Sequence, residues 1–288
     1  MILGQRVAVV LPAYEAAATL PGVWADLARH ACVDDVILVD DASPDATVAV
    51  ARSLGLDPIV HPENRGYGGN QKTCYAAALA RGADIVVMLH PDGQYPPALV
   101  TALASLVASG CYDLVLGSRI TGQPLRGGMP RYKYVANRAL TAVENMLLGL
   151  KLSEYHSGYR AFSARLLRRL PLDALSDDFV FDNQIIAQAV DAGFRLGELS
   201  CPTHYGPESH SIGFRRAVRY GLGVLATAAG YRWSRWGRRP AWLGPSAEDL
   251  ADGVIAERRL AEIAADPTQL VSGEALDRQL AALFAADR

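Results

Sequence analysis

Polar side chains that could bind an anion, a base or a metal ion follow several apolar runs of this 288-residue chain, at the points where predicted strands end. They are Tyr14, Asp40, Asp41, Asp92 and Arg119. In a parallel α/β sheet, ligands bind beyond the carboxyl ends of the strands, so these side chains should converge on one crevice. Their positions therefore predict a ligand site at one edge of the sheet.

The adjacent acids Asp40 and Asp41 end a predicted strand. Carboxylates in this position can accept hydrogen bonds from a base N–H and from ribose hydroxyls. In the alternative interpretation, Asp41 and Ser43 cap the helix that follows. Asp92 lies in the segment 90–97, where it could bind a hard divalent cation that also bridges a diphosphate. The alternative there is a Pro/Gly turn with an acid facing solvent.

A glycine-rich segment, NRGYGGN at residues 64–70, precedes a predicted helix. Glycines at the start of a helix let backbone N–H groups approach a phosphate or a ribose, and Arg65 adds a positive charge. A plain flexible turn is the alternative interpretation. Two other phosphate-binding patterns are absent from the sequence, because it has no GxxxxGK[ST] and no GxGxxG after the first strand.

A regular alternation of strands and helices must position these residues. Short apolar runs predict strands at residues 7–11, 36–40, 59–61, 84–90 and 113–117. Helical patterns fall between them, at residues 19–31, 44–54, 70–81 and 97–109. This alternation predicts an α/β fold, with a mostly parallel sheet and helices on both faces.

Beyond Arg119 the pattern changes. We expect long helices at residues 131–148 and 214–236, a shorter one at 182–192, a polar loop at 153–163 and an extended segment at 194–205. From residue 246 the chain is acidic and Ala-rich, which predicts one or two further helices. The predicted organisation is one α/β domain over residues 1–210 and a helical C-terminal extension over residues 211–288.

Composition narrows the class of protein. Half of the residues are apolar, a fifth are charged and the net charge is −2, which argues for a globular protein and against a chain-wide nucleic-acid surface. The four cysteines are widely spaced and form no CxxC pair, which indicates reduced thiols and no zinc site. The sequence has no signal-peptide pattern and no apolar run of about 18 residues. We therefore expect a cytoplasmic protein without a membrane-spanning helix.

The order of the motifs resembles a known family. VVLPAYEAAATL, ILVDDASPDAT, ENRGYGGNQKT, VVMLHPDGQYPP and VLGSR follow one another as in family 2 glycosyltransferases with the GT-A fold, a Rossmann-like architecture. The later motifs LSEYHSGYRAF and FVFDNQIIAQAVDAGFRLGELSCPT are similar to those of polyprenyl-phosphate sugar synthases, such as dolichyl-phosphate mannose and glucose synthases. The resemblance covers residues 5–205.

This resemblance implies an inverting hexosyltransferase that uses a UDP- or GDP-sugar, a divalent cation (Mg²⁺ or Mn²⁺) and a polyprenyl-phosphate-type lipid acceptor. A soluble enzyme that glycosylates a hydroxyl of a small molecule, glycan or protein is the first alternative. A catalytically silent nucleotide-sugar-binding protein and a nucleotidyltransferase are further alternatives.

The resemblance also assigns residues to roles. For the nucleotide sugar it implies Pro12, Tyr14, Glu15, Asp40, Asp41, Arg65, Gly66, Asp92, Gln94 and Arg131. Arg119 would neutralise the departing diphosphate, and Asp182 would act as a base if the acceptor is a hydroxyl. On the acceptor side it implies Ser157, Gly158, Tyr159, Arg160, His204 and His210.

Three features depart from the family pattern. His90 replaces the first acid of the DxD metal motif, so the metal would depend on Asp92, with the His90 imidazole either a second ligand or a buried strand-end residue. The basic acceptor-loop residues common in the polyprenyl-phosphate enzymes are not evident at residues 202–210, where His204 and His210 could substitute. The transmembrane helices of many relatives are also absent.

The predicted helix at residues 214–236 carries several arginines interleaved with aromatic residues. Basic and aromatic residues on one amphipathic helix suit an anionic membrane surface, which predicts peripheral binding to the cytoplasmic face of a membrane. In the alternative interpretation, the apolar stretch 222–229 packs on the domain and the arginines are solvated.

Overall fold

The computed structural model describes residues 1–122, 124–125, 127–203 and 214–244. Met1–Gly244 form one compact unit. The strands are β1 Val7–Ala13, β2 Asp35–Asp40, β3 Ile59–Val60, β4 Ile85–Met88, β5 Leu114–Ser118, β6 Arg160–Ser163 and β7 Leu196–Ser200. The α-helices are α1 Leu20–Leu27, α2 Thr47–Ser53, α3 Gly66–Ala80, α4 Val100–Ala108, α5 Arg131–Leu148, α6 Ala164–Arg169, α7 Phe181–Asp191 and α8 Phe214–Ser234. Short 3₁₀ helices are η1 Pro97–Leu99, η2 Leu172–Ala174 and η3 Ala241–Leu243.

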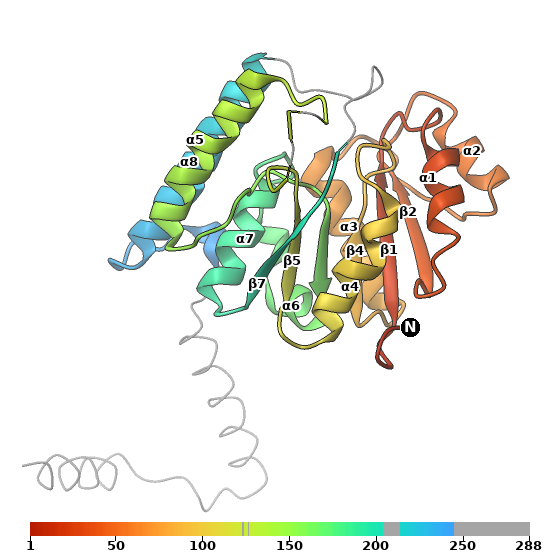
Figure 1. Cartoon of the computed structure of the whole chain (residues 1–288), viewed down its shortest axis with the longest axis horizontal. Helices are drawn as coiled ribbons and strands as arrows, with labels where there is room; N and C mark the ends of the chain where they lie inside the picture. The colour runs from red at the N-terminus through yellow and green to blue at the C-terminus, as the bar shows by residue number, and fades with distance from the viewer. Residues whose placement is uncertain (123, 126, 204–213, 245–288) are drawn as a thin grey trace, which may run out of the picture. The chain divides into compact units, whose positions relative to one another are not determined.

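The strands form one seven-stranded sheet in the order β3-β2-β1-β4-β6-β5-β7. β1 pairs in parallel with β2 and β4, β2 with β3, and β5 with β7. β6 is antiparallel to both of its neighbours, β4 and β5. The sheet lies between layers of helices (Figure 1), so the predicted α/β class with a mostly parallel sheet is confirmed.

The sheet is covered on both faces, which explains the continuous apolar runs of its central strands. Every residue of β1 and β4 is buried. Alternate residues of β1 belong to different cores: Ala8 and Val10 pack with α3, α6 and α7, while Val7 and Val9 pack with α1 and α4. In strands that are buried on both faces, polar and apolar residues do not alternate. These strands were predictable because their apolar runs are short and because glycines mark the ends of the helices between them.

One strand was not expected. Residues 160–163 form β6, although the sequence predicted a polar loop there. The reason is Arg160, a fully buried arginine at the start of the strand. Its guanidinium donates to the carbonyl oxygens of Ser157, Tyr155 and Asp182, at 2.8–3.0 Å. These three hydrogen bonds offset the cost of burying the guanidinium charge in the sheet. A local sequence pattern does not reveal them, because the acceptors are backbone carbonyl groups.

The start of α2 also differs from the prediction. The helix begins at Thr47, three residues after Pro44, the expected first position. Asp45 forms the turn before it, because its carboxylate accepts hydrogen bonds from the Thr47 N–H (3.0 Å) and from the backbone N–H of Ala17 (3.2 Å).

The helix expected at residues 214–236 is α8, which ends at Ser234 and packs against α5 and α7. It therefore belongs to the same compact unit as the sheet, whereas the predicted domain boundary preceded it. The buried side of α8 (Val224, Thr227, Ala228 and Tyr231) makes this packing possible. The predicted acidic tail lies outside the described residues. No helix among the described residues is long and apolar enough to cross a membrane.

Candidate active site

The carboxyl ends of β1, β2, β4 and β5 lie at one edge of the sheet, because these four strands run in the same direction. The predicted strand-end residues all fall at this edge, and they are Tyr14, Asp40, Asp41, Asp92 and Arg119. Tyr14 and Glu15 are exposed there, while Pro12 is buried within β1. The sequence therefore located the edge of the sheet that carries the polar residues.

Asp41 clamps the start of α3 to the end of β2. Its Oδ1 accepts the backbone N–H of Arg65 (2.8 Å) and its Oδ2 accepts that of Gly66 (3.0 Å). His61 Nδ1 lies 2.7 Å from the same Oδ1. Asp40 is also buried, and its Oδ1 has no hydrogen-bond partner among the described residues. Three predicted nucleotide-binding residues, Asp41, Arg65 and Gly66, are thus brought together by one carboxylate.

The glycine-rich segment packs closely against another loop. The backbone N–H groups of Gly68 and Gly69 both donate to the Asp177 carbonyl, at 2.7 and 3.3 Å. A Cβ atom at Gly66 would lie 2.6 Å from that carbonyl oxygen, and one at Gly68 would lie 2.8 Å from the Phe181 Cβ. These N–H groups are therefore paired within the protein, and close packing against residues 176–181 requires the glycines. The contact of Arg65 and Gly66 with a nucleotide stays a prediction.

His90, at the first acidic position of the metal motif, contacts Tyr67, which in turn is bonded to Asp182. The Tyr67 hydroxyl donates to Asp182 Oδ2 (2.8 Å) and lies 3.1 Å from His90 Nε2. Burial and the Asp182 charge raise the pKa of Tyr67, so the phenol keeps its proton. Since that single proton points to Asp182, His90 must donate from Nε2, which leaves the lone pair on Nδ1. Burial lowers the pKa of His90 and keeps the ring neutral.

Asp92 follows β4 and is partly exposed. One oxygen, Oδ1, accepts the backbone N–H of Gln94 (3.0 Å), and the other has no hydrogen-bond partner among the described residues. No group of three or more His, Cys, Asp or Glu residues in the described chain could hold a metal by itself. One carboxylate oxygen fits a hard divalent cation, provided that a ligand such as a diphosphate supplies the remaining oxygens.

Asp182 lies at the start of α7 and is surrounded by donors. Besides the Tyr67 hydroxyl, its carboxylate accepts the Gln71 side-chain amide (3.2 Å), and Arg160 Nη1 lies 3.4 Å from Oδ1. Asp182 is 5% exposed. The carboxylate therefore orients three side chains at once, which is a positioning role that α7 and α3 create together.

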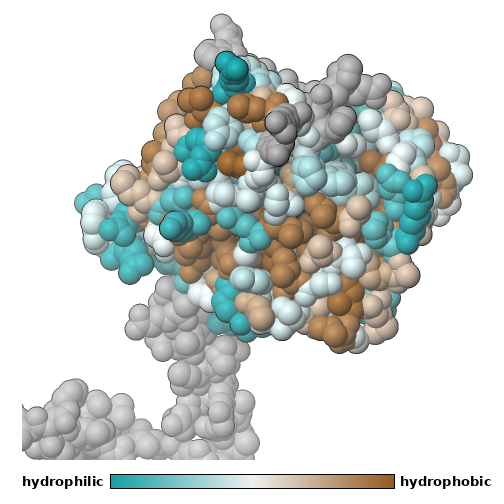
Figure 2. All heavy atoms as spheres, in the orientation of Figure 1, coloured by the Kyte–Doolittle hydropathy of each residue, from teal (hydrophilic) through white to brown (hydrophobic). Residues whose placement is uncertain are grey.

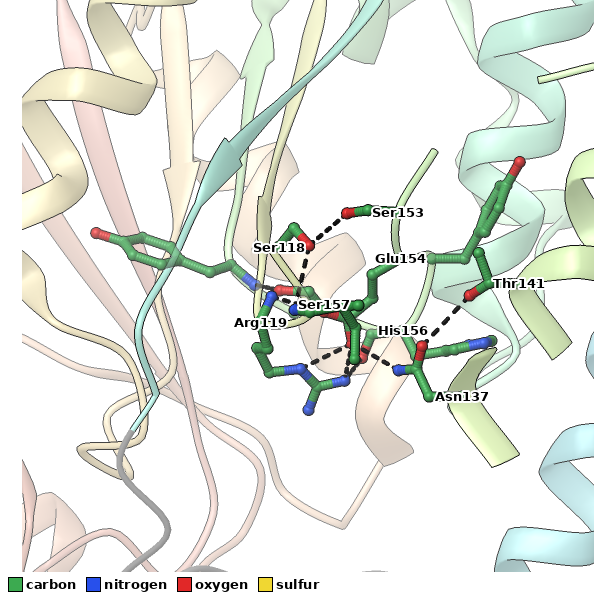
Figure 3. Close-up of polar contacts among 12 residues, drawn as sticks. Ser118, Arg119, Asn137, Thr141, Ser153, Glu154, His156 and Ser157 are labelled. Carbon is green, nitrogen blue, oxygen red and sulfur yellow. Dashed lines mark hydrogen bonds and ion pairs between the residues drawn. The ribbon is translucent and has the colours of Figure 1, made fainter. Parts of the chain in front are cut away.

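Arg119 is held by Glu154, as Figure 3 shows. The Glu154 carboxylate accepts the Arg119 backbone N–H (2.7 Å) and Nε–H (2.8 Å), and it also pairs with Nη2. Arg119 Nη2 also donates to the carbonyl of His156 (2.9 Å). From α5, Asn137 donates to the same carboxylate at 2.8 Å. Burial raises the pKa of Glu154, but the Arg119 charge and its hydrogen bonds outweigh burial and hold that pKa below its usual range.

The predicted acceptor-side loop lies next to His90. Ser157, Tyr159 and Arg160 are fully buried, and a Cβ atom at Gly158 would lie 2.8 Å from His90 Cδ2. The loop therefore needs glycine at this position to pass the imidazole. Arg131 is exposed at the start of α5. His204 and His210 lie outside the described residues.

A second polar cluster lies where the 149–159 loop meets α5, α7 and α8. Tyr220 donates to Asn183 Oδ1 (2.9 Å), and Asn183 donates to Glu144 Oε1 (2.6 Å). His156 Nδ1 lies 2.9 Å from the Tyr220 hydroxyl, and its Nε2 lies 3.3 Å from Glu144 Oε2. The Tyr220 hydroxyl gives its proton to Asn183, so its oxygen must accept the Nδ1–H of His156. The lone pair on Nε2 then faces the Glu144 carboxylate, so one of these two groups must carry a further proton. Burial raises the pKa of Glu144 to about 8 and lowers that of His156 to about 4, which places this proton on Glu144.

Sequence reasoning did not single out Tyr67, Gln71, Glu154 or the Glu144 cluster. Tyr67 and Glu154 stand inside motifs that were noticed, but their partners are 115 and 35 residues away in the chain. The one local signal was the density of polar residues in the 153–163 segment, which was interpreted as a loop.

Comparisons with known proteins agree with this geometry. The family model for glycosyl transferase family 2 matches residues 8–171. The polyprenol monophosphomannose synthase of Mycolicibacterium smegmatis is 30% identical over 204 residues, which span 68% of this chain and 76% of that protein. The undecaprenyl-phosphate mannosyltransferase of Micrococcus luteus is 32% identical over 201 residues, which span 68% of this chain and 82% of that protein.

Solved structures share the fold. The glucosyl-3-phosphoglycerate synthase of Mycobacterium tuberculosis, in complex with UDP, aligns with a TM-score of 0.63 at 22% identity and covers 80% of each chain. Another structure of that enzyme holds Mn²⁺ together with UDP. This likeness shows the GT-A architecture expected from the motifs. With its sheet, its strand-end polar residues and the family match over most of the sheet, the chain belongs to the family 2 glycosyltransferases.

Proposed function

We propose that this enzyme transfers a hexose, with inversion, from a UDP- or GDP-sugar to the phosphate of a polyprenyl-phosphate-type lipid, with the help of Mg²⁺ or Mn²⁺. The observation that carries the proposal is the likeness, over 68% of the chain, to two enzymes named for mannosyl transfer to polyprenyl phosphates. The proposal that the sugar donor is a nucleotide sugar is based on the GT-A fold and on the strand-end polar residues.

The donor would lie at the carboxyl edge of the sheet. Tyr14 and Glu15 are exposed there and could contact the nucleoside. Asp40 Oδ1, which has no hydrogen-bond partner among the described residues, could accept a hydrogen bond from an N–H of the base. Asp92 would hold the cation, with Gln94 beside it and His90 Nδ1 as a further possible ligand atom. When bound, the cation supplies positive charge to the diphosphate.

Charge on the departing nucleoside diphosphate is the main barrier that this chain must lower. Arg119 would stabilise that charge, because its guanidinium is already oriented by Glu154 and the His156 carbonyl. A preorganised cation needs no rearrangement during the reaction, which is the reason such groups contribute strongly to catalysis. Arg131 at the start of α5 is the second candidate cation.

A lipid phosphate is already anionic and can attack without a strong base, in contrast to a hydroxyl. This agrees with the surroundings of Asp182, whose oxygens accept bonds from Tyr67 and Gln71. Asp182 would then position these side chains rather than remove a proton. If a hydroxyl were the acceptor, Asp182 would remain the candidate base, and the exchange Asp182→Asn would abolish transfer to it.

A lipid acceptor places the reaction at a membrane, which we propose to be the cytoplasmic face. The contact expected from α8 is compatible with its packing: Val224 and Tyr231 face the domain, while Leu222 and Trp233 are exposed. Packing on the domain accounts for one side of this helix, and the exposed side is the one proposed to contact the membrane.

Isothermal titration calorimetry of the full chain with UDP and GDP, each with and without Mn²⁺, tests the donor half of the proposal. One nucleotide should bind more tightly in the presence of the metal. If neither nucleotide binds under any condition, the proposed donor is wrong.

A further inference from the structure

Large apolar side chains are exposed mainly on two neighbouring helices. Seven of the twelve exposed large hydrophobic residues in the described chain lie on α5, on α8 or within two residues of its end. They are Tyr132, Val135, Met146, Val218, Leu222, Trp233 and Trp236, with exposed fractions of 71, 64, 70, 48, 64, 57 and 73%. Such clustering is unlike the scattered exposed apolar residues of an ordinary surface and marks an interaction site.

On each helix these residues share one side. In α5, residues 132, 135, 139, 142 and 146 are all apolar and exposed, at alternating spacings of three and four. The buried residues Asn137, Thr141, Glu144 and Leu148 occupy the opposite side. In α8, the exposed Val218, Leu222 and Trp233 share a side in the same way, opposite Val224 and Tyr231. The side of α5 that faces the domain is thus mostly polar and its outward side is apolar, whereas α8 carries apolar residues on both sides.

The two outward sides belong to one surface. α5 and α8 pack along each other, and Figure 1 shows them side by side beyond the sheet. At their contact, the Leu140 side chain approaches Gly221 closely, within 3.9 Å of the place a Cβ would take. In the space-filling view, hydrophobic residues lie among hydrophilic ones over this part of the molecule (Figure 2).

The charges around this surface have one sign. The exposed charged residues of α5 and α8, and of the segment just after α8, are all arginines in the described chain: Arg131, Arg138, Arg216, Arg219, Arg232, Arg235 and Arg238. The one acid in either helix, Glu144, is buried. The protein as a whole has a net charge of −2, so this concentration of positive charge is local.

We propose that α5 and α8 together form a docking face for an anionic lipid bilayer, with the apolar residues entering the interface and the arginines contacting lipid head groups. An apolar strip with arginines and tryptophans at its borders suits this partner, since tryptophan favours the interfacial region and arginine extends to the charged surface. α5 gives the face a second, independent helix, and its Asn137 also contacts the Glu154 carboxylate that holds Arg119. The inference deepens the proposed function by assigning the surface through which the enzyme meets its lipid.

Co-sedimentation of the full chain with vesicles tests this face. Phosphatidylcholine vesicles with and without phosphatidylglycerol contain no polyprenyl phosphate, so binding does not depend on the acceptor. Wild-type protein should sediment with the anionic vesicles and not with the zwitterionic ones. The α5 double variant Val135→Glu/Met146→Glu and the α8 double variant Leu222→Glu/Trp233→Glu should each reduce binding about tenfold or more, since each places charge in an apolar contact.

Leu3→Glu is the matched control, because Leu3 is 77% exposed and far from these helices in sequence; it should bind as the wild type does. Thermal melting shows whether each variant folds. Wild-type-like binding by the folded α5 variant would remove α5 from the face, and failure of wild type to bind anionic vesicles would overturn the proposal. If sedimentation velocity shows a vesicle-free dimer that both double variants dissociate, the face is an interface between two copies instead. Transfer to a short-chain, water-soluble lipid phosphate reports on the proposed function separately.

Discussion

Arg119 illustrates how one side chain gains its role from residues distant in sequence. Its guanidinium is fixed by Glu154 and by the His156 carbonyl. We expect Arg119→Ala to lower kcat by about 10²–10³, the cost typical of losing one preorganised electrostatic contact. Steady-state kinetics measure the effect. Arg165→Ala is the control, because Arg165 is exposed and paired with Asp113 at the other end of the sheet. A kcat for Arg119→Ala equal to that of the control would contradict the assigned role.

Asp92 is the one acid of the predicted metal motif, because His90 stands at the other acidic position. Asp92→Asn should therefore remove the metal-dependent part of nucleotide binding and leave the metal-independent part. Calorimetry with and without Mn²⁺ separates the two. Asp57→Asn, at an exposed acid in the α2–β3 connection, should leave both parts unchanged. Metal-dependent binding that survives in Asp92→Asn would mean that other groups hold the cation.

At the scale of elements, the start of α3 depends on close contact with the 176–181 segment. Gly68→Ala should lower the stability by about 1–3 kcal/mol, because the added methyl would overlap the backbone near Ser176 and the Phe181 side chain. Gly22→Ala, inside α1 with nothing within 4 Å of the added methyl, should raise it by about 0.5–1 kcal/mol. Urea denaturation measures both. Equal stability of the two variants would show that the contact at Gly68 is not tight.

The Glu144 cluster joins three helices and should make stability depend on pH. The pKa of Glu144 is raised from 4.5 to about 8 in the folded chain, so its stabilising contribution is complete below pH 4.5 and is lost as pH rises through 8. His156 has the opposite sign: its pKa falls from 6.5 to about 4, so its contribution is complete above pH 6.5 and is lost as pH falls through 4. Between pH 6.5 and 8, Glu144 alone of the two changes stability.

Glu144→Gln tests this assignment, because glutamine resembles a protonated glutamate in shape. The variant should be more stable than wild type at pH 6.5, where unfolded Glu144 is already ionised, and should lack the wild-type decrease in Tm between pH 6.5 and 8. Thermal melting across this range gives both values. A large loss of Tm at pH 6.5 would show instead that Glu144 is ionised and paired with a charged His156.

Local patterns predicted most of the elements. β1, β2, β4 and β5 appear as buried apolar runs, and α5 has the predicted bounds because its polar and apolar residues alternate with the helical period. β6 was missed because Arg160 looks solvated in sequence, while its acceptors are carbonyl groups that only the fold brings near. α2 starts later than predicted because Asp45 forms a turn before the helix and accepts the Thr47 N–H.

At the scale of the whole molecule, the sequence located the edge of the sheet that carries the strand-end polar residues, but not the hydrogen bonds among them. Strand ends are predictable, and parallel strands bring them together. That Asp41 binds the backbone of Arg65, or that Glu154 holds Arg119, depends on packing between segments far apart in the chain. The outward stripe of α5 was likewise unrecognised, because an apolar helix side is normally assigned to the core until its neighbours are known.

The most direct test of the central claim is to compare a short-chain polyprenyl phosphate with the corresponding polyprenol as acceptors, by mass spectrometry of the products. Each reaction contains the full chain, Mn²⁺ and a mixture of UDP- and GDP-hexoses. The account predicts a hexosyl phosphate adduct of the lipid phosphate and no adduct of the alcohol, because the two acceptors differ only in the anionic group that attacks. Glycosylation of the polyprenol, or release of free hexose with neither acceptor modified, would contradict it.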